Sequence, residues 1–397
     1  MTTTESNTSL AKYLQPITKE CNELLQEPQH KQFKPAGQIL NAVGTATTVS
    51  FYLVIKNVFP SLLTVYQAAD STASIRALLE IFTQIFDAAI VVYDSSLTKG
   101  SDLEIENPIS LFKDRLFEMI SKALMSTSKD EVSLRIAAIR GLLRLCQIRA
   151  LLEKGEVGLF IQYCQEIYLE QEAYDRDDLG DQAIKALVDL STLYPQQAME
   201  MTVPAFISRL PDSCKDESLR FLVPLQGLAQ LGIQDQLFGL IVRRLLSRLD
   251  LVIQYQPNQA TSALYPEAIL MTLSYLFKRR KLSHDPNLGE YVEKIVHNLV
   301  GRVALGASDT SQATILNNSK CMEALGRLAG AVVHSLDEHK QKAIGLRVYA
   351  LEDAHFVPVP FRANASEPER LTLVISTHLL AAARPLVSLS ISLRTYR

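Results

Sequence analysis

The histidines of this sequence lack the spacing of a helical metal site. Such a site needs two ligands four residues apart, so that both imidazoles project from one face of a helix. The nearest approach is His334 and His339, which are five residues apart, and we interpret this pair as part of a solvated helix end. No residue is therefore assigned to a metal. The seven histidines are His30, His284, His297, His334, His339, His355 and His378.

The cysteines are also too far apart to hold a cofactor. They form no C-x-x-C pair and no run of four, which argues against an iron–sulfur cluster or a structural zinc held by this chain alone. An odd, scattered set is typical of reduced thiols in the cytosol or nucleus. We expect core thiols, no cofactor, and no stoichiometric iron in the purified chain. The five cysteines are Cys21, Cys146, Cys164, Cys214 and Cys321.

No pattern in the sequence indicates a catalytic centre. A phosphate-binding loop needs closely spaced glycines followed by a lysine, and a hydrolase elbow needs G-x-S-x-G; neither occurs. Ser335, Asp337 and His339 lie near one another on a polar stretch, which we interpret as a local coincidence. We therefore predict no catalytic, cofactor-binding or metal-binding residue. A hydrolase or metal enzyme hidden in the loops has no motif behind it.

Two charged segments remain as candidate binding sites. Residues 166–181 are the most acidic stretch; as a loop, they would dock a basic partner or simply keep a long connection soluble. The basic run Lys278, Arg279, Arg280 and Lys281 opens a predicted polar loop that extends to Asn287. It fits a nuclear-import or nucleic-acid patch, or an ordinary solvated loop.

The overall charge favours protein partners. There are 40 Lys+Arg and 43 Asp+Glu residues, so no net field attracts the chain to nucleic acid or anionic lipid. The first ten residues have no basic or apolar region typical of a secretory signal. Polar residues interrupt the most apolar segments, 51–65 and 78–92, so we predict no transmembrane helix.

The apolar residues of segment 183–250 predict four amphipathic helices, because leucines recur there at helical spacing. Residues that end or turn helices separate them, at Pro195, at Pro211 and at Gly232. Two helix hairpins of this size cannot bury their apolar faces alone, so they must stack on further copies. The sequence predicts an all-α fold, an α-solenoid of HEAT-like helix pairs with an armadillo-type arrangement.

The same pattern predicts helices along most of the chain. The partner of 130–145 is predicted to be 157–168, and the partner of 265–276 to be 291–303. Residues 94–107 are predicted to be a polar loop, and prolines make 356–361 extended. The other predicted helices begin near residues 10, 35, 51, 71, 108, 322 and 367. We divide the chain into an N-terminal helix and linker (1–32), a HEAT array (33–350), and an extended segment with a C-terminal helix at 367–382 (351–397).

Pairs of apolar residues mark equivalent positions of the repeats. They recur at roughly 41 to 52 residues, near the period of HEAT repeats, and indicate about seven helix pairs. The pairs are Leu142/Leu145, Leu187/Leu190, Leu228/Leu231, Leu273/Leu276 and Leu325/Leu328, with weaker ones at Leu40/Val43 and Phe82/Ile85.

Four segments resemble one known family. They are SFYLVIKNVFPSLLTVYQAA (50–69), LLEIFTQIFDAAIVVYD (78–94), ALVDLSTLYPQQAMEMTVPAFISRLPD (186–212) and LFGLIVRRLLSRLD (237–250). They are similar to the fungal branch of the HEAT-repeat subunit of the cytosolic iron–sulfur assembly targeting complex, also described as a nucleotide-excision-repair and RNA polymerase II transcription regulator. The resemblance covers most of residues 50–333, and its motifs are repeat signatures.

The resemblance implies a non-catalytic scaffold in the nucleus and cytoplasm that supports cluster delivery to DNA repair, replication and transcription proteins. Its implied partners are a β-propeller subunit, a small assembly factor and iron–sulfur client enzymes, without direct nucleic-acid or membrane contact. Full-length members are considerably longer, so the chain is expected to correspond to the C-terminal, partner-docking part. The last residues, 383–397, depart from the family's final repeat helices.

An alternative is another HEAT scaffold, such as a nuclear transport receptor or a phosphatase regulatory subunit; recovery of the propeller subunit in a pull-down would distinguish the two.

We expect docking at residues 259–333 and at the helix 367–382. Charge reversal at Arg279 and Arg280 is then expected to slow association in a salt-dependent way. Deletion of 364–397 is expected to weaken binding and leave the helices intact.

Overall fold

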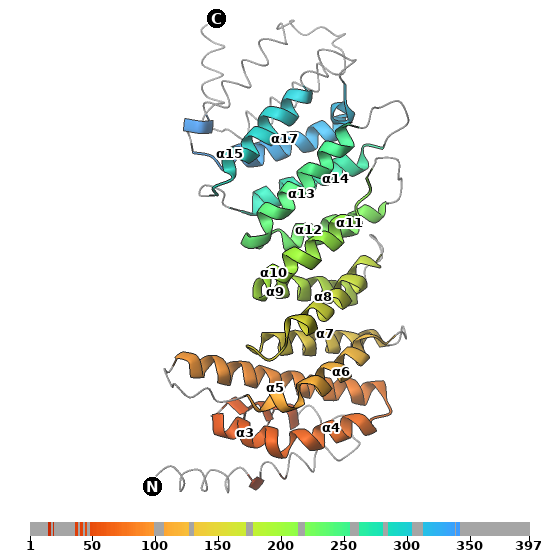
Figure 1. Ribbon diagram of the computed structural model, residues 1–397. Coiled ribbons are helices and arrows are strands. Elements are labelled where there is room, and N and C mark those ends of the chain that lie inside the picture. Colours follow the sequence, from red (N-terminus) through yellow and green to blue (C-terminus); the bar gives the residue numbers. More distant parts are fainter. Residues whose placement is uncertain are drawn as a thin grey trace, which may run out of the picture. The chain divides into compact units, whose positions relative to one another are not determined.

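A computed structural model describes residues 48–98, 107–126, 131–171, 178–212, 219–254, 262–280, 285–303 and 313–337, with a few residues outside these ranges. The regular structure of these residues is entirely helical, which confirms the predicted all-α class (Figure 1). Among the described helices, none is both long and apolar enough to cross a membrane. The predicted segments 356–361 and 367–382, and nearly all of 1–32, lie outside the described residues.

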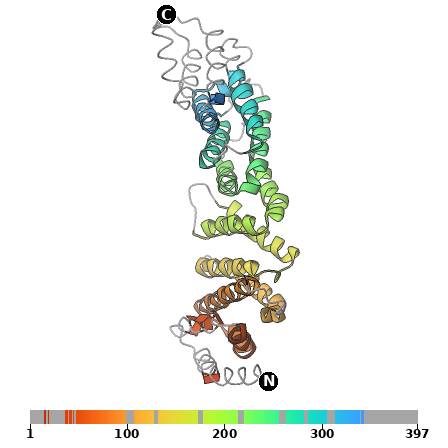
Figure 2. The ribbon, with the colours of Figure 1, turned by 90° about the vertical axis from the view of Figure 1, so that its left-hand side faces the viewer.

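The chain divides into two compact units, residues 1–202 and 203–397. In the first unit α5 packs on α7 and α7 on α9, while α6 packs on α7 and α8 on α9 (Figures 1 and 2). Its helices are α3 (Thr48–Asn57), α4 (Phe59–Ala68), α5 (Thr72–Thr98), α6 (Lys113–Leu124), α7 (Val132–Gln147), α8 (Lys154–Leu169), α9 (Asp178–Leu193) and α10 (Pro195–Gln197), with the 3-10 helix η1 (Pro108–Phe112) and the π-helix η3 (Ala198–Thr202).

The second unit repeats this arrangement. Here α12 packs on α14 and α14 on α17, while α13 packs on α14 and η5 on α17. Its helices are α11 (Val203–Ser208), α12 (Leu222–Leu231), α13 (Asp235–Gln254), α14 (Leu264–Arg279), α15 (Leu288–Tyr291) and α17 (Ser319–His334), with the 3-10 helices η4 (Leu219–Phe221) and η7 (Ile315–Asn317) and the π-helix η5 (Val292–Leu299).

Prolines lie in the first turn at two helix starts. Pro60 lies in the first turn of α4, after a break at Val58. Pro108 opens η1, and the Asn107 side chain accepts a hydrogen bond from the Ile109 backbone N–H. A proline is tolerated at a first turn because its missing N–H would have no partner within the helix.

The predicted repeat positions are confirmed by burial. The leucine pairs of α7, α9, α12, α14 and α17 are each no more than 1% exposed, and so are Phe82 and Ile85 of α5. These helices are the ones that stack on one another within each unit. Each buried leucine stabilises its unit by about 1.5 to 3 kcal/mol, so the stacked layer provides much of the core.

The predicted pairing of helices is wrong by one helix. Segment 157–168 belongs to α8, which packs more extensively on α9 than on α7, and η5 packs on α17 instead of on α14. The sequence does not determine this choice, because in a stack every helix has two chain neighbours and both connections are short. Side-chain packing selects the partner, and the observed pairs are α6–α7, α8–α9, α11–α12, α13–α14 and η5–α17.

Two predicted loops are shorter than expected. Residues 94–98 continue α5. Within the acidic segment, residues 166–169 end α8 and residues 178–181 begin α9. Asp178 and Asp181 lie in the first turn of α9, where carboxylates interact favourably with the helix dipole, so part of the acidic run serves helix formation.

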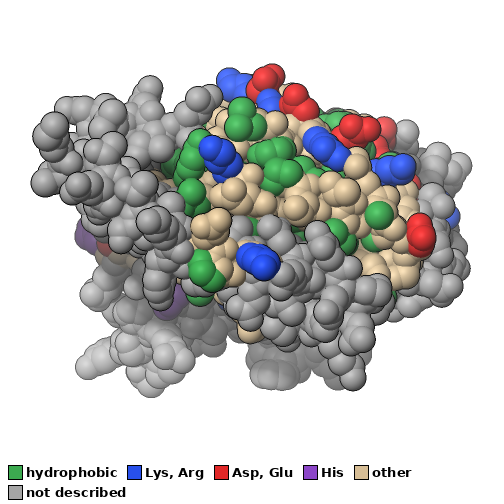
Figure 3. All heavy atoms as spheres, turned by 90° about the horizontal axis from the view of Figure 1, so that it is seen from below, with side chains coloured by type: hydrophobic (Ala, Val, Ile, Leu, Met, Phe, Trp, Pro, Cys, Tyr) green, Lys and Arg blue, Asp and Glu red, His purple; other side chains and the backbone are tan. Residues whose placement is uncertain are grey.

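Viewed from the side of α3 and α4, hydrophobic, basic and acidic side chains are interspersed on the surface (Figure 3).

Candidate functional site

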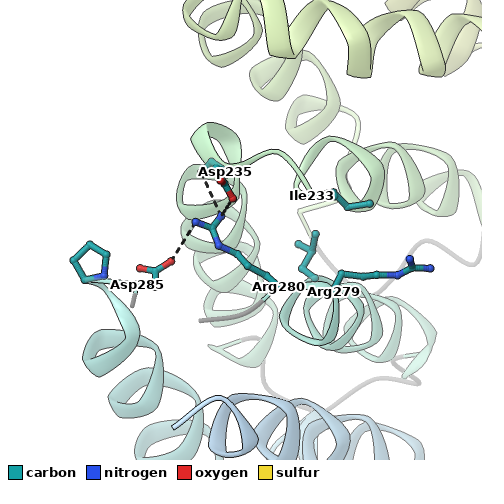
Figure 4. Close-up of a pocket in the computed structure, with 7 residues that line it drawn as sticks. Ile233, Asp235, Arg279, Arg280 and Asp285 are labelled. Carbon is teal, nitrogen blue, oxygen red and sulfur yellow. Dashed lines mark hydrogen bonds and ion pairs between the residues drawn. The ribbon is translucent and has the colours of Figure 1, made fainter. Parts of the chain in front are cut away.

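A surface pocket of about 440 Å³ lies in the second unit, where three chain segments meet (Figure 4). They are the turn between α12 and α13, the C-terminal end of α14, and the segment before α15. The pocket is therefore formed by connections between successive helix pairs, a common place for binding residues on a repeat scaffold. Its lining residues are Ile233, Asp235, Leu276, Arg279, Arg280, Asp285 and Pro286.

Arg280 joins two of these segments. Its Nη1 lies 3.3 Å from the Asp235 carboxylate and donates to the Asp235 backbone carbonyl, also at 3.3 Å. Its Nη2 lies 3.7 Å from Asp285 Oδ2. The two carboxylates differ in exposure, because the Asp235 side chain is 85% exposed and that of Asp285 only 6%. Arg280 is therefore the main charge that compensates a buried Asp285.

The Arg280 guanidinium also lies over an aromatic cluster. Its Cζ is 4.5 Å from the centre of the Phe238 ring, a distance at which a cation is attracted by the negative face of the ring. Phe238 packs edge to face on Phe277 and Tyr291, with ring centres 5.5 and 6.0 Å away. Burial, together with the nearby Asp285 carboxylate, raises the pKa of Tyr291. The phenol therefore stays neutral beneath the ion pair.

Arg279 has a different environment, although it is the next residue. Figure 4 shows its side chain directed away from Asp235 and Asp285, on the side of Ile233. Its Cζ lies 5.2 Å from the Tyr275 ring, and it has no carboxylate partner in the part of the chain that the structure describes. Arg279 is thus an exposed cation that stacks on an exposed ring.

The basic run is consequently not the polar loop that the sequence predicts. Lys278 and Arg279 form the last turn of α14, where basic residues interact favourably with the negative end of the helix dipole. Arg280 caps the helix and is held by two carboxylates. Lys281 lies outside the described residues. Among the described residues of the run, Lys278 and Arg279 fit the predicted description of exposed basic residues.

The described cysteines are core residues, as predicted. Cys146, Cys164 and Cys321 are free thiols, each at most 2% exposed. Burial raises the pKa of Cys146 to about 12 and that of Cys164 well above its ordinary value. Cys21 and Cys214 lie outside the described residues. Within the described ranges, no three His, Cys, Asp or Glu side chains come together in a way that would hold a metal ion.

The residues of the polar stretch after α17 interact with neighbours in their own helical turns. The Ser335 hydroxyl donates to the Ala331 carbonyl at 3.0 Å, and the Asp337 carboxylate accepts from the Lys340 backbone N–H at 2.9 Å. Lys340 Nζ lies 3.1 Å from the same carboxylate. These contacts are those of a helix end.

Comparison with known proteins finds one family model similar to most of the second unit. Residues 224–396 match the family model described as RNAPII transcription regulator C-terminal. The chain is 23% identical over 280 residues to the DNA repair/transcription protein mms19 of Schizosaccharomyces pombe, a match that covers 70% of this chain and 27% of that protein. It is 25% identical over 191 residues to the DNA repair/transcription protein MMS19 of Saccharomyces cerevisiae, covering 48% and 18%. The matches thus span only 27% and 18% of these relatives' own length.

A homologue from Xenopus laevis, described as an MMS19 nucleotide excision repair protein homolog, is 22% identical over 227 residues, covering 57% of this chain and 21% of that protein. Among solved structures, importin beta covers 92% of this chain with a TM-score of 0.45 and 13% identity, over 48% of its own chain. A Kap121p mutant covers 95%, with a TM-score of 0.46 and 13% identity, over 39% of its own chain. The family match includes most of the terminal residues 383–397 that depart from the expected repeat pattern.

Proposed function

We propose that the chain is a non-catalytic scaffold of the cytosolic iron–sulfur assembly targeting complex, because it is similar to the C-terminal region of the MMS19 family. The match of residues 224–396 to the family model is the observation that carries this proposal. The fold is compatible with it, because stacked helix pairs offer long surfaces and inter-repeat loops on which other proteins dock. The relatives' names add a link to DNA repair and transcription.

The partners follow from the family resemblance. They are a β-propeller subunit, a small assembly factor and client enzymes that receive the cluster, in the nucleus and cytoplasm. The cluster is cargo in this scheme, and the chain brings its carrier and its client together. The proposal includes no direct contact with nucleic acid or membrane, in keeping with 40 basic and 43 acidic residues.

We place docking on the later repeats, at residues 259–333 together with 367–382. The first range contains α14, α15, η5 and α17, and the C-terminal end of α14 lines the pocket described above. Connections between repeats vary without disturbing the core, so they are suited to partner recognition.

The proposal is tested with purified components. The chain, immobilised by an affinity tag, should retain the purified propeller subunit and the small assembly factor at near-equal molar amounts. Deletion of residues 364–397 should weaken retention and leave the circular dichroism of the other helices unchanged, because repeats contact only their neighbours. Failure of the intact chain to retain either protein would refute the proposal. Retention of a phosphatase catalytic subunit instead would favour another class of HEAT scaffold.

A further inference from the structure

One face of α14 carries large hydrophobic side chains that no other described element covers. Leu264, Met271 and Tyr275 are 43%, 39% and 37% exposed. Their spacing of seven and four residues puts them on the same side of the helix. At 1.5 Å per residue, they form a stripe about 16 Å long, or three helical turns. Single exposed hydrophobic residues are ordinary on a protein surface, but a continuous stripe of them marks a contact site.

The stripe is a property of α14 and not of every helix in its layer. The neighbouring α17, which packs on α14, exposes only polar positions. The corresponding face of α12 exposes Gln226. Within this layer, α12 and α17 therefore expose polar residues, and α14 differs from both. The exposed residues of α17 are Ser319, Lys320, Glu323, Arg327 and His334.

The structure explains why the stripe cannot be part of the core. The opposite faces of α14 are already in contact with α12, α13 and α17, through residues such as Ile269, Leu273 and Leu276 that are at most 1% exposed. The helix is thus apolar on two sides. One side holds the unit together, and the other is available to a second protein.

The charges near the stripe indicate the kind of partner. Positive charge lies at its C-terminal end, where Lys278 and Arg279 are exposed and have no carboxylate partner among the described residues. The Arg279 guanidinium stacks on Tyr275, so one of these charges is held directly beside the stripe. At the N-terminal end, Glu267 lies in the first turn of α14. A complementary partner therefore needs carboxylates at the Arg279 end.

We propose that the α14 face formed by Leu264, Met271, Tyr275 and Arg279 docks an amphipathic helix of a partner protein, with Asp or Glu residues at the end that meets Arg279. A helix fits because α14 offers side chains but no free sheet edge, and two helices pack by inserting ridges of side chains into grooves. This inference rests on the proposed scaffold function, for which it names a surface and the chemistry of the partner.

The probes are two labelled synthetic peptides of about four helical turns. Both carry leucines at the i, i+4, i+7 and i+11 positions; one ends in a turn of glutamates and the other in the same turn with lysines. Fluorescence anisotropy with the full chain should show binding of the glutamate peptide at least tenfold tighter than the lysine peptide. The preference should decrease as salt screens the charges.

Substitutions on the exposed faces of α14 and α17 identify the binding site. Met271→Asp, or Tyr275→Ser as a second variant, should weaken binding of the glutamate peptide at least tenfold. Arg279→Glu should reverse the preference toward the lysine peptide. Arg327→Glu, a charge reversal on the exposed face of α17, is the matched control and should change neither affinity. All four residues are exposed or partly exposed, and unchanged circular dichroism and thermal unfolding verify that each variant is folded.

Several results would overturn the proposal. The first is equal binding of both peptides, and the second is an Arg279→Glu variant that keeps the original preference. The third is an Arg327→Glu variant that changes the peptide preference as much as Arg279→Glu does. Binding to phosphatidylserine vesicles that Met271→Asp abolishes would assign the face to a lipid surface, and a dimer that Met271→Asp dissociates would assign it to a second copy of the chain.

Propeller-subunit retention, measured on the same variants, separates this proposal from the scaffold function. If neither peptide binds while the propeller subunit is retained, the docking surface on α14 is refuted and the scaffold function is not. If the glutamate peptide binds with the expected pattern while the propeller subunit is not retained, the scaffold role is refuted and the surface stands.

Discussion

At the scale of single residues, neighbouring arginines of one basic run have different roles. Arg280 compensates the buried carboxylate of Asp285 and lies over Phe238, whereas Arg279 contacts only Tyr275 at the surface. A charge reversal at both positions, as the sequence suggested, would combine two effects. Arg279→Glu reports on association with a partner, while Arg280→Glu would place a third carboxylate beside Asp235 and Asp285.

We therefore predict different stabilities for the two alanine variants. Arg280→Ala should lower the free energy of unfolding by about 1 to 3 kcal/mol, because it leaves the Asp285 carboxylate buried without its cation. Arg279→Ala should change it by no more than about 0.5 kcal/mol. Urea unfolding followed by circular dichroism measures both. Equal shifts in the unfolding midpoint would contradict the structural role of Arg280.

The buried thiols give a second prediction at this scale. Burial raises the pKa of Cys146 to about 12, so almost no thiolate is present at pH 8, and thiolate is the reactive form. Brief exposure of the native chain to iodoacetamide should leave Cys146, Cys164 and Cys321 unmodified, and exposure in concentrated urea should modify all three. Peptide mass spectrometry distinguishes the sites. Rapid modification of Cys164 in the native chain would contradict its full burial.

At the scale of elements, Gly232 permits the close packing of α12 on α14. A Cβ atom at this position would lie 2.6 Å from Leu276 Cδ2 and 3.0 Å from the Leu228 carbonyl oxygen. Leu276 is only 1% exposed, so it has little room to move. The glycine is thus required by the approach of two helices.

Gly232→Ala should destabilise the second unit by about 1 to 3 kcal/mol, the usual effect of overpacking a well-packed core. Gly289→Ala is the matched control in the same unit, because a Cβ there meets nothing within 4 Å. The control should be neutral or stabilising by up to about 1 kcal/mol, since alanine favours a helix more than glycine does. Thermal unfolding of both variants tests the contrast, and two similar melting temperatures would argue against close packing at Gly232.

The helices themselves were predictable because a stripe of buried leucines appears directly in the sequence. Leu187 and Leu190, for example, recur as equivalent buried positions in α9, just as Leu273 and Leu276 do in α14. Which helix pairs with which was not predictable, because it depends on side-chain fit between elements. Likewise, the sequence does not show whether a basic residue at a helix end is exposed to solvent or forms an ion pair with a carboxylate.

The candidate site was predictable only in part. The basic run drew attention to Arg279 and Arg280, but Asp235 lies 45 residues before Arg280, and only the stacking of α13 on α14 brings them together. The apolar face of α14 did leave a signal that we missed. Leu264, Met271 and Tyr275 form a second stripe on the side opposite the buried one, so α14 is too hydrophobic for a helix with a single covered side.

At the scale of the whole molecule, the proposed scaffold role implies that the chain supports cluster transfer without binding a cluster itself. The described cysteines are buried and belong to different helices: Cys146 to α7, Cys164 to α8 and Cys321 to α17. The chain purified under anaerobic conditions should contain well under one equivalent of iron. After treatment with iron and sulfide and then desalting, its iron content should still be well under one equivalent. Iron and sulfide near one cluster per chain would contradict the prediction.

The last prediction concerns how far a local defect propagates through the chain. Each unit buries its own core, and in a repeat protein stability is approximately a sum of repeat and nearest-neighbour terms. Phe160→Ala in α8 removes a fully buried ring and should cost about 3 to 5 kcal/mol. Hydrogen exchange should accelerate strongly in α7, α8 and α9 and little in α14 and α17. Phe277→Ala in α14 is the reciprocal control, with the opposite pattern. Equal acceleration throughout the chain in both variants would mean that it unfolds as one cooperative body.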